Sequence, residues 1–212
     1  MTRAHRTSPR PRLRRRARRA ASQAGFTLIE VMVAVGIITV GTLGLVSLQQ
    51  AATRGNMESR QMTHATQRTR AWIERLERDA LNWNVQGAPA TTRINTNYIQ
   101  TVDNVWRTPP AVVLGQNAGA DFSGRDLLAG DATLPTYCTQ VRLRWAVQGQ
   151  LIRADVRTFY MRSAWENDDS QYNLMNGCSA GAEPAVTAAL STTNTDLRAV
   201  YATTLLRWSP LQ

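Results

Sequence analysis

The chain has 212 residues, of which 43% are hydrophobic, and carries a formal net charge of +10 from 25 basic and 15 acidic residues. All the basic residues are arginines, and nine precede Gly25, so the remaining 16 nearly balance the acidic side chains. This balance argues against a nucleic-acid partner for the body of the protein, since binding to phosphates requires an excess of positive charge.

Residues 1–24 form a basic leader without acidic residues and with very few apolar ones, so this stretch cannot build a packed core. Arginine-rich segments beside a membrane span stay on the cytoplasmic side. We therefore expect the residues after Leu48 to lie on the far side of the membrane, which in a bacterium is the periplasm.

An apolar run of 23 residues extends from Phe26 to Leu48 and contains one charged residue, Glu30. As a helix it is roughly 35 Å long, enough to cross a hydrocarbon core of about 30 Å. It is longer than the apolar region of an ordinary cleaved secretory signal. Because a carboxylate inside a membrane is costly unless it has a partner, Glu30 is a candidate functional residue.

The string Gly25-Phe26-Thr27-Leu28-Ile29-Glu30, followed by the apolar run, resembles the class III signal of type IV pilins and the related pseudopilins. The resemblance implies that a prepilin peptidase cuts between Gly25 and Phe26 on the cytoplasmic face and methylates the new amine of Phe26. Residues 1–25 are then lost, and residues 26–48 remain as the membrane anchor and the filament-core half of a helix.

Two partners are open to Glu30 after such a cut. Its carboxylate can pair with the Phe26 amine of its own chain, four residues away, at the positive end of the helix dipole. It can also pair with the Phe26 amine of a neighbouring subunit and so set the register of subunits in a filament. The resemblance favours the second hypothesis, because assembly then removes an unpaired charge from the lipid.

Residues 49–82 continue as an amphipathic helix, which ends before Gly87 and Pro89. Apolar or small residues recur every three or four positions: Met62, Ala65, Thr69, Trp72, Leu76 and Ala80, joined by Ile73. The opposite face is predicted to be solvated, with a Glu74 to Arg78 pair at i, i+4; it carries Arg68, Arg70, Glu74, Arg75, Glu77 and Arg78.

Residues 83–135 are rich in Asn, Thr, Ala, Gly and Pro and read as an irregular connector, with a strand around residues 93–102. Residues 136–212 read as a small antiparallel sheet domain. Apolar and polar residues alternate over 141–147 and 152–160 around Gly149, which predicts a hairpin, and a third strand is expected over 198–208. The predicted fold class is α+β, with the long helix covering one face of the sheet. The pilin resemblance implies the same architecture.

The chain has two cysteines, Cys138 and Cys178. Two thiols in a periplasmic domain usually oxidise to a disulfide, which here would close a 41-residue span and contribute roughly 4 kcal/mol. The alternative is a catalytic thiol, but the one histidine after the leader, His64, has no sequence cue that pairs it with either cysteine.

No other catalytic chemistry is indicated, because the motifs G-x-S-x-G, H-E-x-x-H, the Walker loop and the dinucleotide fingerprint are missing. One histidine beside a bridged cysteine pair supplies too few ligands for a metal, and we expect no cofactor. The acidic stretch 166–170 could offer oxygens to calcium but lacks the glycine of a calcium loop, so it reads as a solvated turn.

Within the pilin superfamily, residues 25–60 are most similar to the minor pilins called PilV, or pilus modification proteins. This resemblance implies an inner-membrane protein that enters a type IV pilus and supports twitching motility or adhesion. Its partners would be the prepilin peptidase, the assembly platform, other minor and major pilins and a tip adhesin. The alternative is a minor pseudopilin of a type II secretion system. A third interpretation is a single-pass membrane enzyme or sensor that keeps its leader.

Overall fold

The computed structural model describes residues 25–111, 116–128, 135–161, 178, 181–192 and 196–208. The chain divides into two compact units, residues 1–49 and residues 50–212. Helix α1, Leu28–Ala80, contributes residues to both units. Its start and end lie within two residues of the bounds expected from the apolar run and the amphipathic stripe.

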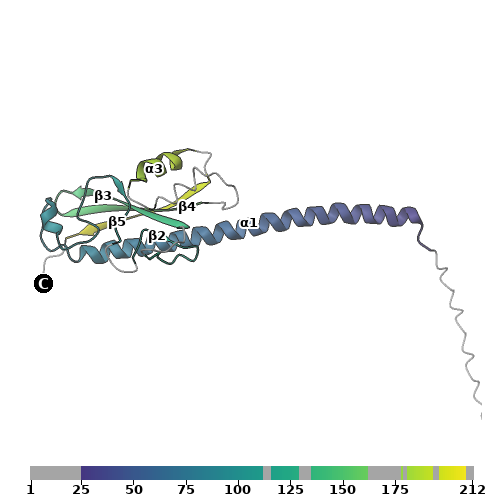
Figure 1. Ribbon diagram of the computed structural model, residues 1–212, viewed down its shortest axis with the longest axis horizontal. Helices are drawn as coiled ribbons and strands as arrows, with labels where there is room; N and C mark the ends of the chain where they lie inside the picture. Colours follow the sequence, from purple (N-terminus) through teal and green to yellow (C-terminus); the bar gives the residue numbers. More distant parts are fainter. Residues whose placement is uncertain are drawn as a thin grey trace, which may run out of the picture. The chain divides into compact units, whose positions relative to one another are not determined.

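The second unit is built on an antiparallel sheet (Figure 1). Its strands are β1 (Trp106–Arg107), β2 (Gly119–Ala120), β3 (Tyr137–Val147), β4 (Leu151–Met161) and β5 (Leu197–Arg207). The strand order is β1-β3-β4-β5, and β2 also pairs with β3. The predicted hairpin is β3–β4, turning at Gly149 with a φ of 73°, and the predicted third strand is β5. The α+β fold class is therefore confirmed.

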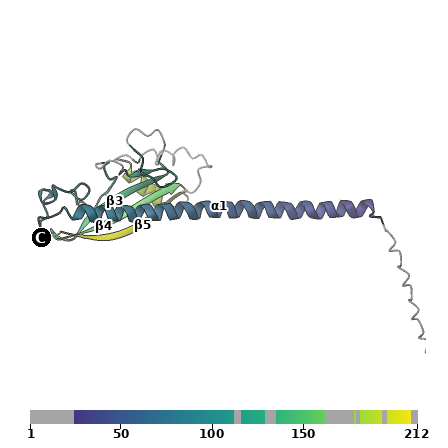
Figure 2. The ribbon, with the colours of Figure 1, turned by 90° about the horizontal axis from the view of Figure 1, so that it is seen from below.

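The second half of α1 lies across one face of this sheet, as Figure 2 shows. Trp72 and Leu76 are fully buried there and pack with Leu143, Val156 and other sheet residues. The predicted stripe is confirmed at Ala65, Thr69, Trp72, Leu76 and Ala80, all of which are buried. The prediction was wrong for Met62, which is 57% exposed because the buried part of the helix begins at Ala65.

The other face of the sheet is partly covered by helix α3, Glu183–Ser191, which the sequence analysis did not predict. Val186 of α3 packs against Phe159 and Leu197, next to Cys138. The expectation of one covered face was therefore incomplete. Figure 1 shows α3 and the sheet-packed part of α1 on opposite sides of the strands.

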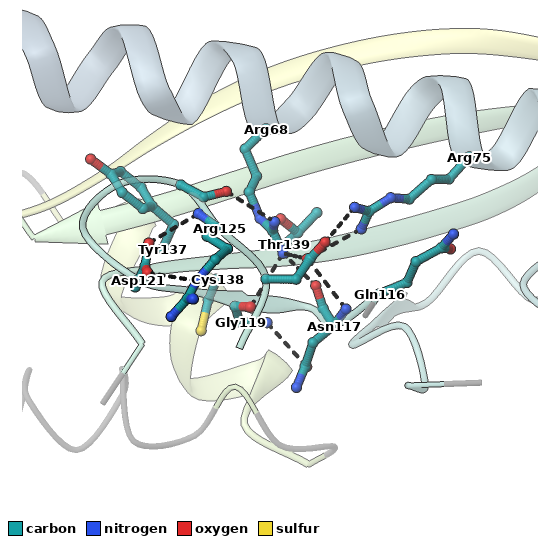
Figure 3. A network of polar contacts seen from close by, with 12 residues as sticks. Arg68, Arg75, Gln116, Asn117, Gly119, Asp121, Arg125, Tyr137, Cys138 and Thr139 are labelled. Atoms are coloured by element: carbon teal, nitrogen blue, oxygen red, sulfur yellow. Dashed lines mark hydrogen bonds and ion pairs between the residues drawn. The ribbon is translucent and has the colours of Figure 1, made fainter. Parts of the chain in front are cut away.

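The predicted solvated face of α1 is wrong at two arginines. Arg68 is 5% exposed, and its guanidinium lies 2.5 Å from the carboxylate of Asp126, which Arg75 also contacts at 2.5 Å. Arg68 also donates to the main-chain carbonyl oxygens of Asn117 and Gly119. Figure 3 shows both arginines reaching from α1 toward these loop residues. The guanidinium groups are thus used to fasten the helix to the connector.

The remaining charged residues of that face, Arg70, Glu74, Glu77 and Arg78, are exposed as predicted. The expected Glu74–Arg78 contact takes a different form, because Arg78 Nε donates to the main-chain carbonyl of Glu74 at 3.2 Å. Glu77 accepts a hydrogen bond from Thr204 of β5 at 2.8 Å.

The strand expected around residues 93–102 is also wrong. Residues Ala90–Arg93 form the short 3₁₀ helix η1, and the residues that follow are held as a loop. The carboxylate of Asp79 accepts the main-chain N–H groups of Asn97, Tyr98 and Ile99 at 2.7, 2.7 and 3.3 Å. In a strand, these main-chain N–H groups would donate to a neighbouring strand. Here the buried carboxylate of Asp79 accepts them instead.

Candidate functional site at the start of the apolar helix

Glu30 lies in the first turn of α1, where it forms a reciprocal cap with Thr27. The main-chain N–H and the hydroxyl of Thr27 both donate to Glu30 Oε2 at 2.9 Å. In return, the main-chain N–H of Glu30 donates to Thr27 Oγ1 at 3.4 Å. This arrangement is a capping box, which satisfies donors that a helix start otherwise leaves without partners.

This cap was not predicted, although the sequence contains its signal. The motif is Ser or Thr, two residues, then Glu or Gln before an apolar run, and Thr27-Leu28-Ile29-Glu30 fits it. Neither of the two predicted partners of Glu30 occurs in the uncut chain, because the nitrogen of Phe26 is a peptide amide there. The pairing of Glu30 with a Phe26 amine stays a prediction.

Gly25 and Phe26 precede the helix and are exposed. A side chain added at Gly25 would meet no atom within 4 Å, and Phe26 is 86% exposed. The peptide bond between them therefore lies outside regular structure and is accessible.

The apolar half of α1 exposes its side chains on all sides. Every residue from 25 to 57 is exposed, including Ile37, Val40 and Leu43 at 69%, 72% and 67%. Soluble monomers rarely expose so large an apolar surface, so this half of the helix requires lipid or neighbouring helices around it. Among the described residues, α1 is the helix whose length and composition suffice to cross a membrane.

The few hydroxyl groups inside the apolar run are satisfied within the helix. Thr39, Thr42 and Ser47 donate to main-chain carbonyls three or four residues earlier, at 2.8, 2.9 and 2.8 Å. These bonds remove the desolvation cost that an unpartnered hydroxyl would carry in hydrocarbon. Glu30 is then the side chain of this run that still carries a charge.

Cys138 of β3 and Cys178 form the expected disulfide, with Cα atoms 5.6 Å apart. No cysteine is left as a thiol, which removes the alternative of a catalytic cysteine in this oxidised state. The ring of His64 packs against that of Tyr137, with centroids 6.3 Å apart.

The described residues contain no group of three or more His, Cys, Asp or Glu side chains able to hold a metal ion. The acidic stretch 166–170 lies outside them.

The carboxylate of Asp126 serves in ion pairs with two arginines. Burial alone would raise its pKa, but hydrogen bonds and charge attraction from Arg75 and Arg68 hold that pKa below its ordinary value.

The comparisons with known proteins point to the same segment. Residues 20–46 match the family model of the prokaryotic N-terminal methylation motif, so Gly25, Phe26 and Glu30 all lie inside the match. No curated protein and no solved structure matches the chain. The motif supports a place in the pilin superfamily, as a pilin or a pseudopilin, and indicates a structural protein. Together with the apolar helix, it fits a protein anchored in the inner membrane.

Proposed function

We propose that this chain is a minor pilin of a type IV pilus, of the PilV type, and that it supports pilus assembly and thereby twitching motility or adhesion. The observation that carries the proposal is a methylation motif whose one acidic residue, Glu30, lies in the first turn of α1, followed by residues 31–48, which are uncharged and exposed. Such a helix suits a subunit that is stored in a membrane and later packed among other helices.

Processing is the first step of the proposal. A prepilin peptidase cuts between Gly25 and Phe26 and methylates the Phe26 amine, and residues 26–48 anchor the chain in the inner membrane. The arginines of the leader keep the cut site cytoplasmic, so residues 49–212 lie in the periplasm. The disulfide between Cys138 and Cys178 supports this topology, because such bonds persist in oxidising compartments.

Assembly is the second step. In the single subunit, the Glu30 carboxylate is satisfied by the neutral donors of Thr27. The methylated amine of Phe26 in a neighbouring subunit is a cation, so it adds to the hydrogen bond an attraction between opposite charges, which is strong in a medium of low dielectric constant. Exchange of the Thr27 cap for that amine therefore favours the assembled state and sets the axial register of the incoming subunit.

The partners in this proposal are other minor and major pilins, the inner-membrane assembly platform and a tip adhesin. A minor pseudopilin of a type II secretion system would share the leader, the anchor and Glu30. The two machines differ in where the mature subunit ends up, since a pilus extends outside the cell.

The experiment replaces Glu30 by Gln in the full chain, with Glu74→Gln as the matched control because Glu74 is an exposed carboxylate on the same helix. The amount of mature subunit is measured in the membrane and in pili sheared from the cell surface. We expect Glu30→Gln to be cut normally but lost from sheared pili, and Glu74→Gln to match the wild type. Wild-type levels of the Glu30→Gln variant in pili would contradict the role of Glu30. A subunit that is missing from pili but required for protein secretion would identify the pseudopilin instead.

A further inference from the structure

Strand β5 is an edge of the sheet as far as the described residues go, and is called the open edge below. It is the last strand in the order β1-β3-β4-β5 and pairs with β4 through 11 consecutive residue pairs, from Leu151↔Arg207 to Met161↔Leu197, without a bulge. Its other side carries no pairing strand among the described residues.

The hydrogen-bond pattern shows which main-chain groups point outward. The N–H of Trp208 donates to the carbonyl of Gln150 at 3.5 Å, so this pair belongs to the hydrogen-bonded set of the ladder. Because hydrogen-bonded and non-bonded pairs alternate in an antiparallel ladder, the even-numbered residues of β5 face β4. The N–H and C=O groups of Ala199, Tyr201, Thr203, Leu205 and Arg207 therefore face the open edge.

This edge lacks the features that usually protect an edge strand, which are short length, proline, bulges and central charges. β5 has 11 residues and no proline, and its charged residues, Arg198 and Arg207, lie near its two ends. The opposite edge of the sheet is different, because the two-residue strands β1 and β2 cover β3. Within the described part of the chain, the sheet is thus paired with short strands at β3 and has no further strand at β5.

An added strand at the open edge would contact a particular set of exposed side chains of β5. Tyr201 and Leu205 are 57% and 58% exposed, and Thr203 lies between them on the same face. Arg207 is exposed at the end of the strand, and the side chain of Arg153, across from Leu205, is 41% exposed. A complementary strand would offer apolar or β-branched side chains in its centre and a carboxylate near Arg207.

A second copy of this chain fits the edge poorly if the chain is a filament subunit, as proposed. Ala65 clusters with Val200 and Leu76 with Leu206, so residues 65–76 of α1 and strand β5 run in the same direction. Antiparallel pairing of two β5 edges would point one copy of the second unit opposite to the other, whereas the subunits of one filament all point the same way. Parallel pairing near register would bring Arg207 of both copies together, and like charges across a strand pair are destabilising.

We propose that the open edge of β5 is an interaction surface that takes up an extended segment of a different protein as an added strand. The segment has about five to ten residues, β-branched or aromatic side chains at alternate positions and a carboxylate that meets Arg207. This proposal deepens the proposed function by assigning the surface through which the periplasmic part of the subunit contacts a partner.

The test uses the full chain in its native host, with the photoreactive amino acid benzoylphenylalanine placed at Tyr201 or at Leu205. Gln67, exposed on α1, is the control position. Irradiation should link both edge positions to one segment of a different protein, at two sites four residues apart, because Tyr201 and Leu205 are four residues apart in β5. Gln67 should not link to that segment.

A second variant tests the main-chain bonds. With the probe at Tyr201, Leu205→Pro removes an N–H that faces the open edge, whereas Leu205→Ala removes the same side chain and keeps the N–H. One lost hydrogen bond corresponds to about a fivefold weaker association. We expect Leu205→Pro to lower the cross-link yield at least about fivefold. The yield of Leu205→Ala should remain within about twofold of that of the chain with the probe alone.

The proposal is overturned if neither edge position forms a cross-link, if the linked protein is a second copy of this chain, or if the two sites do not lie four residues apart. Equal yields for the two Leu205 variants would also overturn it. The N-terminus of each variant is determined in the same cells. An uncut N-terminus would count against the proposed function, while a methylated Phe26 without the cross-link would count against the strand site alone.

Discussion

Replacing Asp126 by Asn should strongly destabilise the second unit, residues 50–212. The carboxylate of Asp126 lies 2.5 Å from both Arg68 and Arg75, and the side chain of Arg68 is only 3% exposed. Removing one partner of a buried ion pair costs about 3–5 kcal/mol, because the other charge stays buried without compensation.

The structure places the expected cost at the lower end of this range. Arg68 keeps three main-chain acceptors, the carbonyl oxygens of Asn117, Gly119 and Gly124. We therefore expect a loss of about 3 kcal/mol, which lowers the melting temperature of a unit of this size by roughly 6–12 °C.

The assay is thermal unfolding of the full chain in detergent, followed by tryptophan fluorescence, since Trp72 and Trp83 are fully buried in the second unit. Asp103→Asn is the matched control, because Asp103 pairs with Arg107 on the surface and such pairs contribute about 0–1 kcal/mol. If the two variants melt within about 2 °C of each other, the Arg68–Asp126 contact does not fasten α1 to the connector.

Three further predictions concern stability. Replacing both Cys138 and Cys178 by Ser should cost roughly 4 kcal/mol in urea unfolding under oxidising conditions, and the cost should vanish when both proteins are compared in reductant. Asp79→Ala leaves three main-chain N–H groups without their acceptor and should cost about 2–4 kcal/mol, with faster amide exchange at residues 97–99 than in a Glu74→Ala control. The pKa of Asp126 is lowered in the folded state, so its carboxylate stabilises the fold at pH values above the ordinary carboxyl pKa, and this stabilisation is lost as the pH falls through the lowered pKa. The melting temperature of the wild type should therefore decrease when the pH is lowered beyond about 4, and that of Asp126→Asn should decrease less steeply.

The sequence predicted the elements whose periodicity is strong. The apolar run and the stripe through Trp72 and Leu76 gave the extent of α1, and strict alternation around Gly149 gave the β3–β4 hairpin. These patterns are reliable because burial of one helix face or one strand face repeats at a period that the sequence displays directly.

The errors occurred where single polar side chains decide the local structure. Arg68 and Arg75 have the spacing of a solvated face, and only the fold brings Asp126 within reach of them. Asp79 accepts the N–H groups of residues 97–99, so these residues form a loop and not the predicted strand. Local periodicity cannot predict this contact, because Asp79 lies 18 residues before Asn97 in the chain. The Thr27–Glu30 cap, by contrast, depends on local spacing alone, and Thr27-Leu28-Ile29-Glu30 displays that spacing directly.

The central claim is that residues 26–48, with Glu30 near their start, are a processed pilin-type anchor, and the most direct test is the N-terminal residue of the protein extracted from membranes. Mass spectrometry of the intact chain and of its first peptide is sufficient. We predict a chain that begins at Phe26 and carries one methyl group on its amine. A membrane-bound chain that still begins with its arginine-rich leader would contradict the claim.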